Sequence, residues 1–269
     1  MKRAIALAFI LVAAGGCAGS GDSEKASGKA GNTGTGSGDA VVARPVYDPA
    51  AHGGVLAGVV SFSGERPGPR SVRMSADPYC DRANSGGAKV ARFDVADSGG
   101  LAGTVVYISA NVPEFEYSLP DETVALDQVN CLYTPRVIAV RAGQGVEIGN
   151  ADSTLHNVHA LPSNSSGFNL GMPRAGMKTV RKFKSPEVFV RFKCDVHPWM
   201  QAHVAVLDHP FFAVTDADGR FKIDGIPPGT YQIEAVHPVL GKQTQTVEIK
   251  DPQQSPEAPE AGLQIEFTG

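Results

Sequence analysis

The strongest constraint on the fold is a repeated pattern of short apolar runs separated by turn residues. The runs are rich in Val, Ile and Phe, they alternate apolar with polar positions, and Gly or Pro marks most of the breaks between them. Successive side chains of a β-strand point to opposite faces, so a period of two indicates strands with one buried face. The chain has 31 Gly and 19 Pro among its 269 residues, which suits many turns. We therefore predict an all-β protein.

The first residues are typical of an export signal. "MKR" carries positive charge, and the apolar stretch "AIALAFILVAA" after it is too short for a comfortable membrane span. The small residues of "AAGGC" before Cys17 resemble a bacterial lipobox, with Ala14 where that family more often has Leu. The resemblance implies a signal peptide over 1–16, a lipid on Cys17 and a membrane as a partner. The location would be the periplasmic face of a bacterial membrane or the cell surface. An ordinary signal peptide cut nearby is the alternative, and it also predicts export.

Residues 17–53 are expected to form a flexible tether. Within them, 18–40 consist mainly of Gly, Ser, Ala and a few charged residues, which cannot bury enough apolar surface to fold. A tether after a lipid anchor would hold a folded domain away from the membrane. The net charge of −4 does not indicate a positively charged surface of the kind that binds nucleic acid, so nucleic acid is not an expected partner.

Three β regions follow the tether: a β segment at 54–121, a central region at 122–208 and a C-terminal region at 209–269. The pattern "TDADGRFKIDGIPPGTYQIEAVHP" in the third region resembles the transthyretin-like β-sandwiches of carboxypeptidase regulatory-like domains. Such sandwiches are scaffolds that say little about chemistry. "DADG" at 216–219 lacks the spacing of a calcium loop and predicts a hairpin turn instead.

In the first β region, strands are predicted at 55–64 and 101–110. The stretch 65–100 between them is rich in Pro, Gly and Ser and is expected to be mostly loop. Strand 101–110 could complete a sandwich of the central region or join the C-terminal one.

Three cysteines remain once Cys17 is assigned to lipid: Cys80, Cys131 and Cys194. An oxidising compartment favours one disulfide among them. Cys80 and Cys131 lie outside the group of His and Met residues around Cys194, so we predict that these two are paired. The alternative is that Cys194 pairs with one of them, which would leave no thiolate for a metal ion.

The stretch "FKCDVHPWM" has the pattern C-x2-H-x2-M, formed by Cys194, His197 and Met200 at the end of a predicted strand. Strand alternation in "EVFVRFKC" puts Cys194 on the same face as Val188, Val190 and Phe192, which is the core face. A strand rises about 3.3 Å per residue and metal–ligand bonds span about 2.0–2.3 Å, so the chain must turn sharply after Cys194 if these donors share a metal. Pro198 keeps His197 out of the helical region and stiffens that turn.

A further donor can come from "NADSTLHNVHA", which contains His156 and His159. Two imidazoles, one thiolate and a weak axial thioether are the ligand set of blue copper centres. "FKCDVHPWM" and "LHNVHA" together resemble the corresponding motifs of the cupredoxins, the blue copper proteins, and those of the amicyanin branch most closely. The resemblance covers about 122–207.

The resemblance implies a cupredoxin-like Greek-key β-sandwich at 122–208, flanked by the additional strands and by the small C-terminal sandwich. It also implies one type 1 copper bound by His156, Cys194, His197 and Met200. Asn157 is expected to connect the two ligand-bearing loops and to tune the sulfur. The other nearby histidines, His159 and His203, are not expected to be ligands.

The implied function is transfer of single electrons between a redox donor protein and a redox acceptor protein. The chain's own residues would fill all four copper positions, so no enzyme activity is expected at this centre. His197 should lie near the surface within an apolar docking patch, whose expected members are Leu155, Met172, Pro173, Pro198 and Trp199. The alternative is a non-redox module that binds polysaccharide or a protein partner and holds a structural or carried copper.

Overall fold

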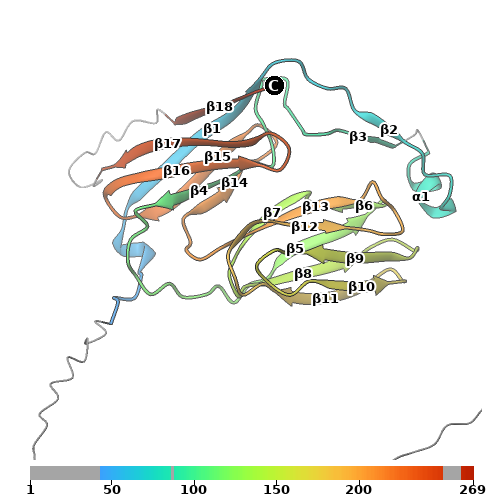
Figure 1. Cartoon of the computed structure of the whole chain (residues 1–269), viewed down its shortest axis with the longest axis horizontal. Helices are drawn as coiled ribbons and strands as arrows, with labels where there is room; N and C mark the ends of the chain where they lie inside the picture. Colours follow the sequence, from blue (N-terminus) through green and yellow to red (C-terminus); the bar gives the residue numbers. More distant parts are fainter. Residues whose placement is uncertain (1–42, 86–87, 251–261) are drawn as a thin grey trace, which may run out of the picture. The chain divides into compact units, whose positions relative to one another are not determined.

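The computed structural model describes residues 43–85, 88–250 and 262–269. The predicted signal peptide, Cys17 and most of the predicted tether lie outside the described residues. From residue 43 onward the chain forms one compact unit that is almost entirely β-structure, which confirms the all-β prediction (Figure 1). No helix in the described ranges is long and apolar enough to cross a membrane.

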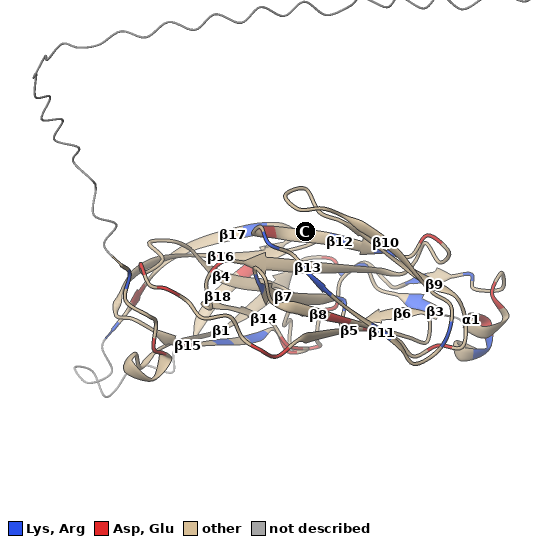
Figure 2. Ribbon diagram, turned by 90° about the horizontal axis from the view of Figure 1, so that it is seen from below, with Lys and Arg blue, Asp and Glu red and all other residues tan. Residues whose placement is uncertain are grey.

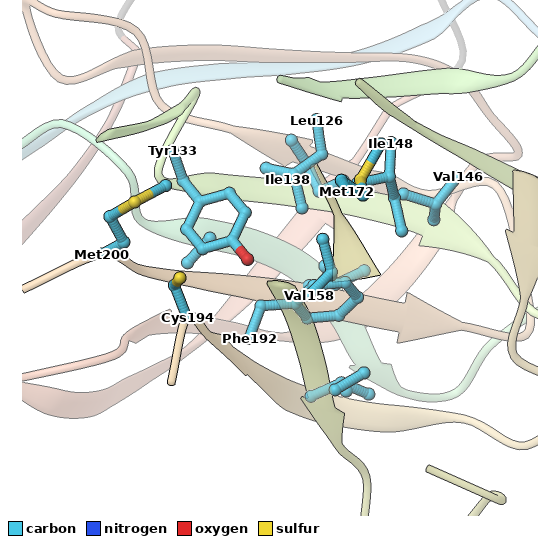
Figure 3. Packing of buried hydrophobic residues seen from close by; sticks show 14 of the residues in the cluster. Leu126, Tyr133, Ile138, Val146, Ile148, Val158, Met172, Phe192, Cys194 and Met200 are labelled. Atoms are coloured by element: carbon cyan, nitrogen blue, oxygen red, sulfur yellow. The ribbon is translucent and has the colours of Figure 1, made fainter. Parts of the chain in front are cut away.

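One β-sandwich consists of the strands between residues 124 and 207. Its five-stranded sheet has the order β10 (Phe168–Met172), β9 (His156–Leu161), β12 (Glu187–Lys193), β13 (Gln201–Leu207), β7 (Val137–Arg141). Its four-stranded sheet has the order β11 (Met177–Lys182), β8 (Gly145–Asn150), β5 (Val124–Val129), β6 (Leu132–Thr134). The two sheets share one core, in which Leu126 and Ile148 of one sheet lie with Val158 and Phe192 of the other (Figure 3).

A second sandwich combines strands from both ends of the described chain. One sheet has the order β15 (Arg220–Ile226), β1 (Gly54–Ser63), β18 (Leu263–Thr268). The other has the order β14 (Phe212–Val214), β4 (Val105–Ala110), β16 (Gly229–His237), β17 (Gly241–Ile249). In Figure 1 the blue strand β1 accordingly lies among orange and red strands. The regions 54–121 and 209–269 therefore contribute to the same sheets, and strand 101–110 belongs to the C-terminal sandwich.

The segment between β1 and β4 is more ordered than expected. It contains a two-stranded ribbon of β2 (Arg70–Val72) and β3 (Ala88–Val90) and a short helix α1 (Pro78–Ala83); a 3-10 turn, η1 (Pro49–Ala51), precedes β1. Asp77 starts α1, because its Oδ1 accepts hydrogen bonds from the backbone N–H groups of Tyr79 (2.8 Å) and Cys80 (3.1 Å). The described part of 65–100 is thus mostly loop, as predicted, but it also contains the three short elements β2, α1 and β3, which the sequence pattern did not predict.

A disulfide joins α1 to the central sandwich. It links Cys80 to Cys131, as predicted, whereas Cys194 is a free and buried cysteine. Cys131 and Asn130 form the two-residue turn between β5 and β6 and have φ angles of 59° and 51°. Positive φ at both positions is typical of a type I′ hairpin turn. The thiol of Cys194 is therefore available to a metal ion.

Charged residues of both signs are interspersed over the described part of the molecule (Figure 2). Surface ion pairs join Lys178 to Glu147 (2.6 Å) and Lys242 to Glu234 (2.9 Å). Solvent screens ion pairs of this kind, so they add little to stability. The fold therefore depends mainly on its buried cores.

Candidate metal centre

The loop between β12 and β13 carries three of the four predicted ligands. β12 ends at Lys193, which pairs with Gln201 at the start of β13, so the loop closes a hairpin. The backbone N–H of Cys194 donates to the Met200 carbonyl (3.2 Å), and the N–H of Met200 donates to the His197 carbonyl (2.9 Å). These two bonds fold the loop back on itself and make the sharp turn that the motif requires.

The fourth predicted ligand, His156, comes from the neighbouring strand. β9 begins at His156 and runs antiparallel to β12, with His159 opposite Lys193. This register places the start of β9 beside the loop that follows β12. Strand pairing therefore brings His156 next to Cys194.

Three side-chain donor atoms converge at this point. The Nδ1 atoms of His156 and His197 are 2.9 Å apart, and His197 Nδ1 lies 3.8 Å from the Cys194 sulfur. Donor atoms of all three residues lie within 4.8 Å of one another. The residues are 0%, 2% and 1% exposed, in the order His156, His197, Cys194. The cluster can offer a metal ion two imidazole nitrogens and one thiolate in a site closed to solvent.

Met200 is buried in the same region. It has no exposed surface, and Figure 3 shows it with Cys194 and Tyr133 at one end of the core. A thioether is the weak fourth ligand of blue copper centres. The structure thus brings His156, Cys194 and His197 together and places Met200 in the same loop.

A carboxylate holds each histidine through its other ring nitrogen. Nε2 of His156 lies 2.9 Å from Asp152 Oδ2, and Nε2 of His197 lies 3.1 Å from Asp77 Oδ2. A metal ion on Nδ1 leaves the ring proton on Nε2, which then donates to the carboxylate. Such a partner fixes the tautomer and the orientation of a ligand ring and raises its basicity.

Backbone amides fix both carboxylates. Asp152 accepts from the N–H groups of Asn130 (2.8 Å) and Cys131 (2.7 Å) at the type I′ turn, while Asp77 accepts from Cys80 (3.1 Å) in α1. The disulfide joins these two segments. The disulfide therefore covalently connects the two segments whose backbone amides hold the Asp77 and Asp152 carboxylates.

Asn157 connects the segment that begins at His156 with the loop that contains Cys194. Its side-chain oxygen accepts from the backbone N–H of Asp195 (2.7 Å) and lies 3.4 Å from the Cys194 sulfur. The remaining histidines near the site lie outside the donor cluster. His159 contacts the Asp195 carboxylate (3.0 Å), and His203 packs against the ring of Phe189.

The electrostatics of the cluster favour a thiolate. Burial raises the pKa of the Cys194 thiol, but hydrogen bonds with His156 and His197 outweigh burial and lower this pKa to about 6. Burial lowers the pKa of His156, whereas its hydrogen bonds with Asp152 and Cys194 raise it to about 9. Cysteine binds metals as the thiolate, so the site presents its sulfur in the binding form at neutral pH.

One prediction about His197 is wrong. The loop position suggested that this histidine lies near the surface, yet it is 2% exposed. Asp77 Oδ2 and the Cys80 sulfur lie 3.1 Å and 3.6 Å from its Nε2 and cover it. The segment entering α1 therefore occupies the position expected for solvent or a partner.

The expected apolar patch is only partly at the surface. Leu155 is 46% exposed, Pro173 and Pro198 are exposed, and Trp199 is half-buried. Met172 is 1% exposed, because the end of β10 turns its side chain into the core of the sandwich. Met172 is therefore removed from the patch.

Sequence reasoning missed Asp77, Asp152 and Tyr133. Asp77 precedes Pro78, which is a recognised helix-start signal, but nothing in the pattern links it to His197, 120 residues away. The Tyr133 hydroxyl donates to the Lys193 carbonyl (3.4 Å) just before Cys194, and burial raises its pKa so that the phenol stays protonated. Only the fold brings these groups to the ligands.

No protein-family model matches this chain, and no curated protein matches it. Among solved structures it is similar to a purple cupredoxin from Nitrosopumilus maritimus, at 23% identity over 32% of this chain and 99% of that one, with a TM-score of 0.27. It is similar to amicyanin from Paracoccus versutus, at 18% identity over 38% and 96% of the two chains, with a TM-score of 0.29. A copper-containing nitrite reductase from Thermus scotoductus matches at 18% identity over 37% of this chain and 25% of that one, with a TM-score of 0.27. These similarities concern about a third of the chain, and the metal assignment rests on the chain's own donor atoms.

Proposed function

We propose that this protein is a type 1 copper protein that carries single electrons between redox partners. The observation that supports this most is the convergence of two histidine Nδ1 atoms and a buried sulfur in one cluster. His156, Cys194, His197 and Met200 would hold the metal. Copper bound there would supply a one-electron couple between Cu(I) and Cu(II).

The donor set fits copper better than zinc. Zinc sites use cysteine, histidine and carboxylate ligands, whereas a thioether beside two imidazoles and a thiolate is the blue copper set. The soft sulfur atoms suit Cu(I) and the imidazoles suit Cu(II), so the set serves both oxidation states. The nearby carboxylates, Asp77 and Asp152, contact the Nε2 atoms and thus act on the ligands rather than on the metal.

Hydrogen bonds preorganise the proposed ligands. Asp152 orients His156, Asp77 orients His197, and Asn157 fixes the start of the Cys194 loop. Little movement is then needed between the two oxidation states. Because the chain's residues fill all four positions, no substrate has a place at the metal, which favours a carrier over an enzyme.

We place the partner-docking patch on exposed apolar residues next to the cluster. Leu155 and Val196 are 46% and 47% exposed, and Pro198 is also exposed; all three adjoin a proposed ligand in sequence or lie in its loop. Exposed Pro173 follows Met172, which is the strand partner of His156. A small patch of this kind suits transient redox encounters. Donor and acceptor would be redox proteins of the exported compartment, and the lipid on Cys17 would tether the carrier to a membrane.

Voltammetry of the purified copper-loaded protein tests this function. We expect a reversible wave with one electron per bound copper and no loss of metal on repeated cycling, since the same ligands hold both states. The metal-free chain is the control and should give no wave. A redox-silent complex, or copper released on reduction, would favour the non-redox binding module instead.

A further inference from the structure

His197 is covered by what we call the α1 cap, namely Asp77 and helix α1 (Pro78–Ala83). Its Nε2 faces Asp77 Oδ2 at 3.1 Å and the Cys80 sulfur at 3.6 Å, and the residue is 2% exposed. The carboxylate of Asp77, whose side chain is 17% exposed, thus takes the contact that water would make at an open loop.

The Asp77 carboxylate is ordered by groups from three parts of the chain. Its Oδ1 accepts from the N–H groups of Tyr79 (2.8 Å) and Cys80 (3.1 Å), and its Oδ2 accepts from the Thr154 hydroxyl (2.6 Å) while facing His197. The disulfide holds the cap against the sandwich. These hydrogen bonds hold both oxygens of the Asp77 carboxylate and so fix its contact with His197.

The other copper-ligand histidine has the same arrangement. His156 Nε2 faces Asp152 Oδ2 at 2.9 Å, and Asp152 is 1% exposed. In the proposed centre, each imidazole would bind the metal through Nδ1 and contact a carboxylate through Nε2.

We propose that Asp77 is a positioning residue that lowers the reduction potential of the copper centre through His197. This inference rests on the proposed function. A carboxylate that accepts the Nε2 proton makes the imidazole a stronger donor at Nδ1. It also adds a negative charge on the far side of a buried ring, through which that charge acts on the metal with little solvent in between.

Both effects favour Cu(II), which has one more positive charge than Cu(I). A lower reduction potential makes Cu(II) harder to reduce, so the electron donor of this carrier must be a comparatively strong reductant. Because the cap covers His197, a partner would reach the centre from the exposed patch rather than through this ring.

The test compares the potentials of Asp77→Asn and Asp81→Asn with that of the wild type. Asparagine is as good as aspartate at starting a helix, so Asp77→Asn keeps the N-cap while it removes the anion beside His197. Asp81 lies in the first turn of the same helix and is exposed, so its replacement makes the same charge change away from the ligand. Redox titration by the absorbance of the copper centre gives both potentials.

We expect Asp77→Asn to shift the Cu(I)/Cu(II) ratio about tenfold toward Cu(I) at a fixed external potential, a rise of about 59 mV for one electron. Copper affinity should fall about 10–100-fold. Asp81→Asn should leave both quantities near their wild-type values. Asp77→Ser, which also caps a helix without charge, repeats the test should Asp77→Asn fail to fold.

Equal potentials for the Asp77 and Asp81 variants in a blue, copper-loaded protein would overturn this inference and leave the proposed function standing. A wild-type copper complex without colour would overturn the proposed function and this inference together.

Discussion

Replacement of Cys194 by Ser is expected to abolish the blue absorption of the copper-loaded protein while the fold persists. The colour of a type 1 centre arises from charge transfer between thiolate and copper, which a hydroxyl oxygen cannot supply. Serine is close to cysteine in size, and the side-chain oxygen of Asn157, now 3.4 Å from the sulfur, can accept its hydroxyl. The fold should therefore lose no more than about 1–3 kcal/mol, the cost of a poorly satisfied buried polar group.

Absorption spectra at equal bound copper, together with circular dichroism, measure the outcome of this substitution. His159→Gln is the matched control, because His159 lies in the same strand as His156 but contacts Asp195 instead of the donor cluster. This control should keep its full colour. A Cys194→Ser protein that stays blue would show that the ligand assignment is wrong.

Removal of the disulfide should cost the metal-free protein about 4 kcal/mol of unfolding free energy. Cys80 and Cys131 are 51 residues apart, and a crosslink over a loop of that length restricts the unfolded chain by about this amount in the chain-entropy model. The double replacement Cys80→Ala and Cys131→Ala avoids new buried hydroxyls. In the folded state, the contact of the α1 cap with His197 should also loosen, because the disulfide holds the cap against the sandwich.

Denaturant unfolding followed by tryptophan fluorescence measures this loss. Trp199 is the only tryptophan of the chain, and its indole N–H donates to the Cys131 carbonyl (2.9 Å), so its signal reports on this region. Cys194→Ser serves as the control, since it removes a buried sulfur without opening a crosslink. If the double variant has the same midpoint denaturant concentration as the wild type, the disulfide does not stabilise the fold and the prediction is wrong.

Local sequence pattern predicts much of the fold. The run at 55–64 forms β1, and the alternation of "EVFVRFKC" correctly predicts that Phe192 and Cys194 are buried. The same alternation is wrong for Val188, which is only partly buried because the strand register shifts between Glu187 and Val190. The pairing of β1 with β15 and β18 could not be read from pattern, because it joins strands from opposite ends of the described chain. Helix α1 escaped prediction because six residues are too few to show a helical period, even with Asp77 and Pro78 at its start.

For the candidate site, too, some features could be predicted from the sequence and others could not. Donor type and spacing predict Cys194, His197 and Met200, since all three lie in one short loop whose turn can be inferred from Pro198. Burial of His197 could not be foreseen, because the cap that covers it comes from a segment 120 residues earlier. The disulfide itself could be predicted from the cysteines, but the packing of α1 over His197 leaves no local signal in a single sequence.

The absorption spectrum of the purified chain, taken with its bound copper counted, tests the central claim most directly. The proposed centre predicts an intense blue thiolate-to-copper band at one Cu(II) per chain, which disappears on reduction and returns on oxidation. A colourless or weakly absorbing complex at the same stoichiometry would contradict a type 1 site formed by His156, Cys194, His197 and Met200.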